Sequence, residues 1–304
     1  MLRDGGGLGR SHPSRTRPRG HRTHNDAPPR VRPVTRPSDD LKMLGVARLV
    51  LGGLVLLRTT WLLGLLHLRY EAGASPLLGW PSDRWHVAAF GLALPTWVVA
   101  ALCVGRTLAI VLFTIGAWTT SAGVAATVLG YVVLSQNVMG YVNTLHLLLL
   151  GMLVLALGGA GTRFALRPEP AVDPRSGLRL VRALVVSVYA WSGFAKLNGS
   201  WLGGDALLQL HDTGIFGGAL SAVLFSTPWR RALTSGSVAA AELALGPLLL
   251  WPRTRPVAVA LAVLLHVVLE ASVHPDFFGF AMAALLLSFV EPRPSRVLDA
   301  APAT

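Results

Sequence analysis

Four polar residues lie within, or at the end of, apolar stretches of this sequence. Lys196 closes an apolar run, His146 and His266 lie inside two others, and Glu242 lies about halfway along a fourth. A lysine amine that has lost its proton is a base, and a histidine can accept or relay that proton. Polar groups inside a membrane cost about 2.5–3.5 kcal/mol each, so they tend to face a cavity or a partner. These residue types predict acid and base chemistry in a polar cavity.

Residue type and spacing argue against several other chemistries. The single cysteine, Cys103, can form neither an internal disulfide, nor a CxxC pair, nor a structural zinc site. His266, Glu270 and His274 recur at four-residue spacing, but Pro275 disfavours helical geometry at His274. Metal binding there is the weaker alternative, and we predict no metal site. The DGGGLG run near the N-terminus fails as a nucleotide fingerprint, because no strand precedes it.

The elements that must position these residues are membrane helices. Of the 304 residues, 52% are hydrophobic and 14% are charged, against about 25% charged in a soluble domain. A soluble monomer is therefore excluded. Since a bilayer core requires about 20 apolar residues per helix, we expect an all-α, polytopic integral membrane helical bundle of about eight transmembrane helices. The expected spans are Leu44–Leu66, Trp85–Val104, Thr107–Val133, Tyr141–Ala160, Leu178–Lys196, Leu233–Trp251, Pro256–Val273 and Asp276–Val290. The third of these is long enough to be either tilted or broken at a glycine, and the last two are expected to form a hairpin.

The positive charge is concentrated before the first apolar run. Residues 1–42 contain ten Lys or Arg and four Asp, a net charge of +6 out of the chain's +12. This proline- and glycine-rich segment predicts a disordered basic cytoplasmic tail, with Met43 as an alternative start. We expect it to touch anionic lipid rather than nucleic acid, because no aromatic residues interleave its arginines. Residues 43–292 then form the transmembrane domain, and residues 293–304 a short cytoplasmic tail.

The arginines of the connections orient the helices, because cytoplasmic connections carry an excess of Lys and Arg. With the N-terminus inside, most of them fall on the inner side, including Arg106, Arg163, Arg175 and Arg253. We therefore expect both termini to be cytoplasmic, in the plasma membrane of a bacterium. The six histidines beyond residue 43 then map to the outer half. The stretch Leu207–Phe225 suits an interfacial or re-entrant element better than a full span.

The stretch from Arg182, RALVVSVYAWSGFAKLNGSWLGGDAL, resembles a signature of the horizontally transferred transmembrane (HTTM) family. This family is related to the membrane domain of vitamin K-dependent gamma-carboxylase. In its pattern a helix ends in A/S-G-x-x-K-L, and W-L/V-x-G follows. VNTLHLLLL is similar to the family's N-H-x-x-L segment, with His146 as the histidine but Asn143 three positions before it. LLHVVLEASVHPDFFGF is similar to a later segment, with His266 as the histidine. The signature residues are Ser192, Gly193, Lys196, Leu197, Trp201, Leu202 and Gly204.

The resemblance implies a gamma-carboxylase-like membrane enzyme that acts on a quinol-like or other lipophilic small molecule in an outward-facing cavity. In the carboxylases a lysine at the Lys196 position acts as the base towards reduced vitamin K, and a histidine at the His146 position assists. We expect Lys196, His146 and His266 to be catalytic. A reduced quinone is the candidate cofactor, and the candidates for binding it are Trp201, Glu242 and Arg58.

Two departures from the carboxylases change this expectation. The carboxylases carry a large luminal region after the membrane domain, which this chain lacks, and Ala195 stands where they have a second lysine. We therefore do not expect protein glutamyl carboxylation. The alternative is a non-catalytic membrane component that assembles with partner proteins. Lys196 would then be a helix-end anchor, and Glu242 a hydrogen-bonded acid or a partner of Arg58. Convergence of Lys196, His146 and His266 on one pocket would discriminate the two functions.

The arginine distribution predicts the topology. Reporter fusions after residues 80, 138 and 205 should read as external, and fusions after residues 170 and 254 as cytoplasmic, because the inner connections hold most of the arginines. A cytoplasmic reading after residue 205 would place Lys196 on the inner side and contradict an outward-facing site.

Overall fold

The computed structural model describes residues 37–71, 94–135, 143–170, 173–212, 219–272 and 277–290. Every regular element within these residues is a helix, which confirms the all-α expectation. The elements are α1 (Pro37–Glu71), α2 (Thr96–Ile115), α3 (Thr119–Ser135), α4 (Asn143–Leu157), α5 (Pro174–Ala195), α6 (Gly199–Leu202), α7 (Asp205–Asp212), α8 (Ala219–Leu224), α9 (Pro228–Leu250), α10 (Arg255–Ser272), α11 (Phe278–Leu286) and the 3₁₀ helix η3 (Leu287–Phe289). The side chains of His67, His86 and His274, and the first part of the expected span at 85–104, lie outside the described residues.

Four of the described helices, α2, α5, α9 and α10, are long and apolar enough to cross a membrane. Three shorter apolar helices accompany them, namely α3, α4 and α11 with its continuation η3. The expected number of about eight spans is thus not confirmed by length and hydropathy. Among its described residues, the expected interfacial stretch contains α7 and α8, of eight and six residues, and neither is long enough to span a bilayer.

Large apolar side chains cover much of the outer surface of these helices. Trp97, Trp191, Trp229 and Trp251 are all more than half exposed. An exposed apolar surface of this kind is typical of helices that face lipid tails, and Trp is enriched where a helix meets the membrane interface. The chain is therefore an integral membrane protein.

Two helix boundaries differ from those expected from hydropathy. α1 begins at Pro37 rather than after Met43, with Asp39 and Asp40 in its first turn, where negative charge interacts favourably with the helix dipole. The break expected at Arg106 is wrong, because α2 continues through this residue to Ile115. Arg106 therefore lies in the middle of a helix and not in an inner connection.

The turn that ends α2 comes at Gly116 instead. Its φ of 75° lies in the left-handed region, and its backbone N–H caps the last turn of the helix. A Cβ at this position would lie 2.6 Å from Ala165 in the connection after α4. A glycine is required here for both reasons, whereas a single charged residue does not end an apolar helix.

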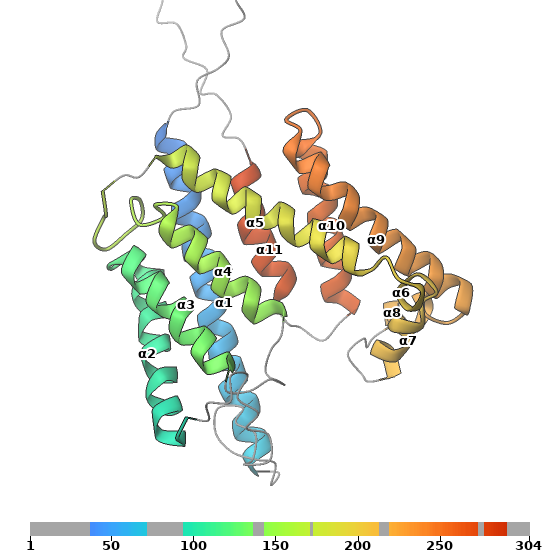
Figure 1. Ribbon diagram of the computed structural model, residues 1–304, viewed down its shortest axis with the longest axis horizontal. Helices are drawn as coiled ribbons and strands as arrows, with labels where there is room; N and C mark the ends of the chain where they lie inside the picture. The colour runs from blue at the N-terminus through green and yellow to red at the C-terminus, as the bar shows by residue number, and fades with distance from the viewer. Residues whose placement is uncertain are drawn as a thin grey trace, which may run out of the picture. The chain divides into compact units, whose positions relative to one another are not determined.

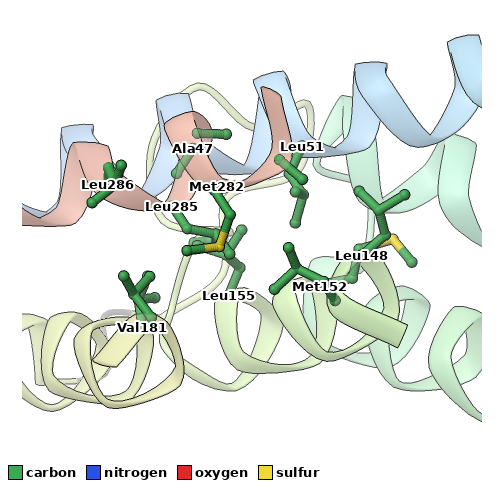
Figure 2. Packing of buried hydrophobic residues seen from close by; sticks show 14 of the residues in the cluster. Ala47, Leu51, Leu148, Met152, Leu155, Val181, Met282, Leu285 and Leu286 are labelled. Carbon is green, nitrogen blue, oxygen red and sulfur yellow. The ribbon is translucent and has the colours of Figure 1, made fainter. Parts of the chain in front are cut away.

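The main core lies where α1, α4, α5 and α11 meet (Figure 2). Side chains from these four helices interdigitate there, and nearly all are fully buried: Ala47, Leu51, Leu148, Met152, Leu155, Val181, Met282, Leu285 and Leu286. α2 and α3 pack together beside α1 and α4, and α9 packs along α5 and α10 (Figure 1). α10 and α11 contact each other, as expected of the predicted hairpin.

Arg48 of α1 is fully buried and joins this helix to the connection after α4. Its Nη1 donates to the carbonyl oxygen of Ala160 at 3.0 Å, and its Nη2 to that of Phe164 at 2.5 Å. One guanidinium therefore satisfies two carbonyl groups of the connection, which a lysine could not do with the same geometry.

We predict that Arg48→Ala destabilises the protein by about 1–3 kcal/mol, because two carbonyl groups lose a charged donor. Arg48→Lys should recover less than half of the loss. Thermal unfolding of the purified protein in detergent measures both effects. Arg253→Ala, at an exposed arginine in the connection between α9 and α10, is the matched control. Equal midpoints for Arg48→Ala and the control would contradict this role.

Candidate functional site

Lys196 caps the C-terminal end of α5, a helix whose beginning is also defined by its sequence. Asp173 is the N-cap and accepts hydrogen bonds from the Arg175 N–H and the Ser176 hydroxyl, and Pro174 takes the first helical position. The Ser176 hydroxyl, together with these backbone N–H groups, holds the pKa of Asp173 below its usual value. At the other end, the backbone N–H of Lys196 bonds to the Gly193 carbonyl. α5 packs along α9 (Figure 1), and Lys196 follows the last residue of α5.

The Lys196 side chain forms an ion pair with Glu242 of α9. Nζ lies 2.6 Å from Glu242 Oε2, and the two side chains are only 16% and 9% exposed. Nζ also donates to the Ser192 hydroxyl at 2.5 Å and to the Ser192 carbonyl oxygen at 3.2 Å. These three acceptors match the three donors of an ammonium group. The Trp201 ring lies 5.1 Å from Nζ and adds a cation–π contact.

Gly193 permits the close approach of α5 and α9 that this ion pair requires. A Cβ at Gly193 would lie 2.7 Å from Leu243 Cγ and 3.0 Å from the Leu243 backbone nitrogen. Glu242 is the neighbour of Leu243 in α9, so any side chain at Gly193 would push Glu242 away from Lys196. The close contact between α5 and α9 therefore explains why the S-G-x-x-K-L pattern has a glycine at this position.

The connection after Lys196 positions Trp201. Asn198 caps the short helix α6 by accepting from the Trp201 backbone N–H at 2.9 Å, and its Nδ2 donates to the Ala195 carbonyl at 2.9 Å. The buried Ser235 hydroxyl of α9 donates to the Trp201 carbonyl. Gly204 follows with a φ of 85° and contacts Arg231 of α9. The W-L-x-G pattern thus fastens the segment after α5 onto α9.

A cavity of about 340 Å³ lies against the Lys196–Glu242 pair. Its polar lining comes from α4, α5, α6, α9 and α10 and includes Trp201, His266 and Glu270. Leu210, Phe225, Phe278 and other apolar residues form the rest. A mostly apolar pocket with a few converging polar groups is typical of a small-molecule site.

Two buried nitrogens on residues that line this cavity have no hydrogen-bond partner within the described part of the chain. They are Trp201 Nε1 and His266 Nδ1. His266 is only 5% exposed, and its Nε2 shares a hydrogen bond of 2.8 Å with the Tyr189 hydroxyl. Leaving a buried polar group unpaired costs about 1–3 kcal/mol, so a small side-chain movement that pairs either nitrogen would be favourable.

Glu270 stands one turn after His266 on α10. Its Oε1 accepts a hydrogen bond of 2.7 Å from the Gly279 backbone N–H at the start of α11. This bond fixes the carboxylate at the wall of the cavity and joins the two helices. Within the described residues, no group of three or more metal-binding side chains comes together.

His146 lines a second, larger cavity of about 1060 Å³ between α4 and α5. Its Nδ1 shares a hydrogen bond of 2.7 Å with the Tyr131 hydroxyl of α3. Lys196, Ser192, Trp201 and Phe278 line both cavities. Lys196 therefore lies where the two cavities adjoin, with His266 on one and His146 on the other. The three residues that we expected to be catalytic do not all line one pocket, so this criterion does not favour the enzyme over the non-catalytic alternative.

Arg58 does not join this site. It lines a separate small cavity with Arg106, and the expected pairing of Glu242 with Arg58 is wrong because Glu242 pairs with Lys196. Sequence reasoning missed Ser192 as the partner of Lys196 and Tyr189 as the partner of His266. Ser192 could have been found, because residues four apart on a helix are neighbours. Nothing in the sequence signals the contact between Tyr189 and His266, which are 77 residues apart.

The apolar helices around a buried lysine–glutamate pair define a helical membrane protein with a largely apolar cavity that a few polar groups line. The chain belongs to the HTTM family, because the family model for the HTTM domain matches residues 36–293. Neither a curated protein nor a solved structure matches this chain. The family match covers every described element and includes Lys196, Glu242, His146 and His266.

We predict that Gly193→Ala separates α5 from α9 and destabilises the protein by about 1–3 kcal/mol, because the added methyl group overlaps Leu243. Gly236→Ala is the matched control on α9, where a Cβ meets no atom within 4 Å. The control should be neutral or slightly stabilising, since alanine favours a helix over glycine. Thermal unfolding in detergent measures the difference, and two equal midpoints would refute the close-approach role of Gly193.

Proposed function

We propose that this protein is a membrane enzyme acting on a lipophilic, quinol-like small molecule, with Lys196 as the base that removes a hydroxyl proton. The observation that carries the proposal is the Lys196–Glu242 pair on the wall of a largely apolar cavity. With the N-terminus in the cytoplasm, this cavity faces outward.

The pair gives Lys196 a route to the neutral amine that a base requires. The Nζ and Oε2 atoms are 2.6 Å apart, so the proton can pass from the ammonium group to the Glu242 carboxylate without either group moving. The amine can then accept a proton from a substrate hydroxyl, and Glu242 stores the proton given up first.

The unpaired nitrogens of the cavity would bind the substrate oxygens. The indole Nε1 of Trp201 is a donor only, so it stabilises an oxygen that becomes negative as its proton leaves. His266 Nδ1 is a second polar contact on the same cavity, and Tyr189 fixes its ring orientation. These contacts favour a substrate with more than one oxygen.

The apolar lining supports a lipophilic substrate. Leu210 and Phe278 line both cavities, and Leu147, Leu150 and Trp191 line the larger one. A ring would fit the smaller cavity, and an apolar substituent the larger one beside His146. A reduced quinone, when bound, would supply the hydroxyl group and two electrons, which dissolved oxygen would accept as the quinol becomes a quinone. We do not propose that the substrate is a protein glutamate.

A non-catalytic role is the second candidate, and one observation favours it. All three donors of the Lys196 ammonium are already satisfied by Ser192 and Glu242. With all of its hydrogen bonds made inside the protein, Lys196 would have a structural role only. We call this role a clamp, because the lysine would hold α5 against α9 while the protein assembles with partners.

Lys196→Arg separates the two functions. Arginine keeps a cation beside Glu242, but guanidinium does not lose its proton in proteins. We predict that turnover of a reduced naphthoquinone such as menadiol, measured by absorbance in detergent, falls about 10²-fold or more, while the unfolding midpoint changes little. The chain has one other lysine, Lys42, which pairs with Asp39 in α1, so Lys42→Arg is the matched control. Full turnover in Lys196→Arg would end the enzyme hypothesis and leave the clamp.

A further inference from the structure

The connection between α4 and α5 lies beside the turn between α2 and α3 (Figure 1), and backbone hydrogen bonds hold it there. The Leu166 N–H donates to the Ile115 carbonyl oxygen at 2.9 Å. The Arg167 N–H donates to the Gly116 carbonyl oxygen at 3.0 Å. Arg48 of α1 binds the same connection from inside the bundle. The fold therefore fixes the conformation of this connection and of the side chains that it presents.

Three large apolar side chains are exposed here, at the end of the bundle. Trp118, Phe164 and Leu166 are 52%, 57% and 74% exposed. Trp118 and Phe164 also have φ values of 51° and 52°, in the left-handed region that bulky residues rarely adopt. Burial of the two rings cannot explain this strain, because more than half of each ring is exposed. Backbone strain of this kind is concentrated at functional sites.

Two exposed arginines, Arg163 and Arg167, lie among these apolar side chains. The Arg167 guanidinium lies 5.2 Å from the centroid of the Trp118 ring. The acidic residue nearest to the two arginines in the sequence is Glu169. Its two carboxylate oxygens accept hydrogen bonds from the Thr120 backbone N–H and hydroxyl group at the start of α3. This part of the surface is therefore both apolar and positively charged.

We propose that Trp118, Arg163, Phe164, Leu166 and Arg167, which we call the loop surface, bind an anionic phospholipid. The loop surface follows the ends of α2 and α4, and α2 is long and apolar enough to cross a membrane. At such a position aromatic side chains meet the boundary between headgroups and acyl chains. Arginines there attract anionic headgroups and bind phosphate oxygens in a bidentate manner. The positive charge selects an anionic lipid over a zwitterionic one.

The test is lipid binding to the full chain in detergent, measured by native mass spectrometry. Phosphatidylglycerol and phosphatidylcholine with the same acyl chains are titrated separately, and the wild type should bind phosphatidylglycerol more tightly. In the double variant Arg163→Gln/Arg167→Gln, half-saturation with phosphatidylglycerol should need about tenfold more lipid or more. Its unfolding midpoint without lipid should not change, because both side chains are exposed.

The double variant Arg175→Gln/Arg253→Gln is the matched control. It removes the same charge from two other exposed arginines and should bind as the wild type does. All variants keep residues 1–42, so the basic charge of that segment contributes equally. Trp118→Ala should weaken the binding of both lipids by a similar factor, because the ring contacts the part that they share.

Equal affinities of the wild type for the two lipids would overturn the proposal. Equal losses of phosphatidylglycerol binding in the two double variants would do the same, because net charge alone would then explain the binding. Either result would leave the loop surface to a protein partner. The loop surface contains no residue of the Lys196 site, so neither result bears on the proposed enzyme function.

Discussion

The ion pair between Lys196 and Glu242 is the interaction on which the rest of the site depends. Two charges inside an apolar bundle must be paired, and breaking a buried pair commonly costs 3–5 kcal/mol. Forming this pair requires α5 and α9 to approach at Gly193. Once α9 is held there, Ser235 fixes the Trp201 carbonyl and Gly204 fits against Arg231. The position of the short helix α6, which follows α5, therefore depends on this one salt bridge.

The buried histidines follow the same rule of pairing across helices. Tyr131 of α3 bonds His146 of α4, and Tyr189 of α5 bonds His266 of α10. Each bond uses one of the two ring nitrogens of the histidine. For His266 the other nitrogen, Nδ1, is buried and has no partner among the described residues. Hydrogen bonds between helices thus fix both histidine rings, and they leave one nitrogen of His266 unpaired within the described part of the chain.

Much of this arrangement could be predicted from local sequence. Apolar runs of membrane length predict the helices. The candidate site is predicted by a motif with a characteristic spacing, which consists of Ser192, Gly193, Lys196 and Trp201. The partner of Lys196 could not be predicted, because Glu242 is 46 residues away and its distance depends on how α5 and α9 pack. The break expected at Arg106 failed for a different reason. Hydropathy cannot distinguish an arginine in a connection from one that faces a cavity, whereas the left-handed turn at Gly116 ends the helix whatever the hydropathy.

The two interior charge systems make opposite demands on their surroundings. Lys196 and Glu242 carry no net charge together, and every donor of the ammonium is satisfied, so their cavity can take a neutral molecule and exchange only a proton with it. Arg58 and Arg106 are both positive and share a cavity whose described lining contains no acid. Burial in a medium of low dielectric constant strengthens interactions between charges, so the charged groups that line each cavity determine its electrostatic character more than its apolar walls do.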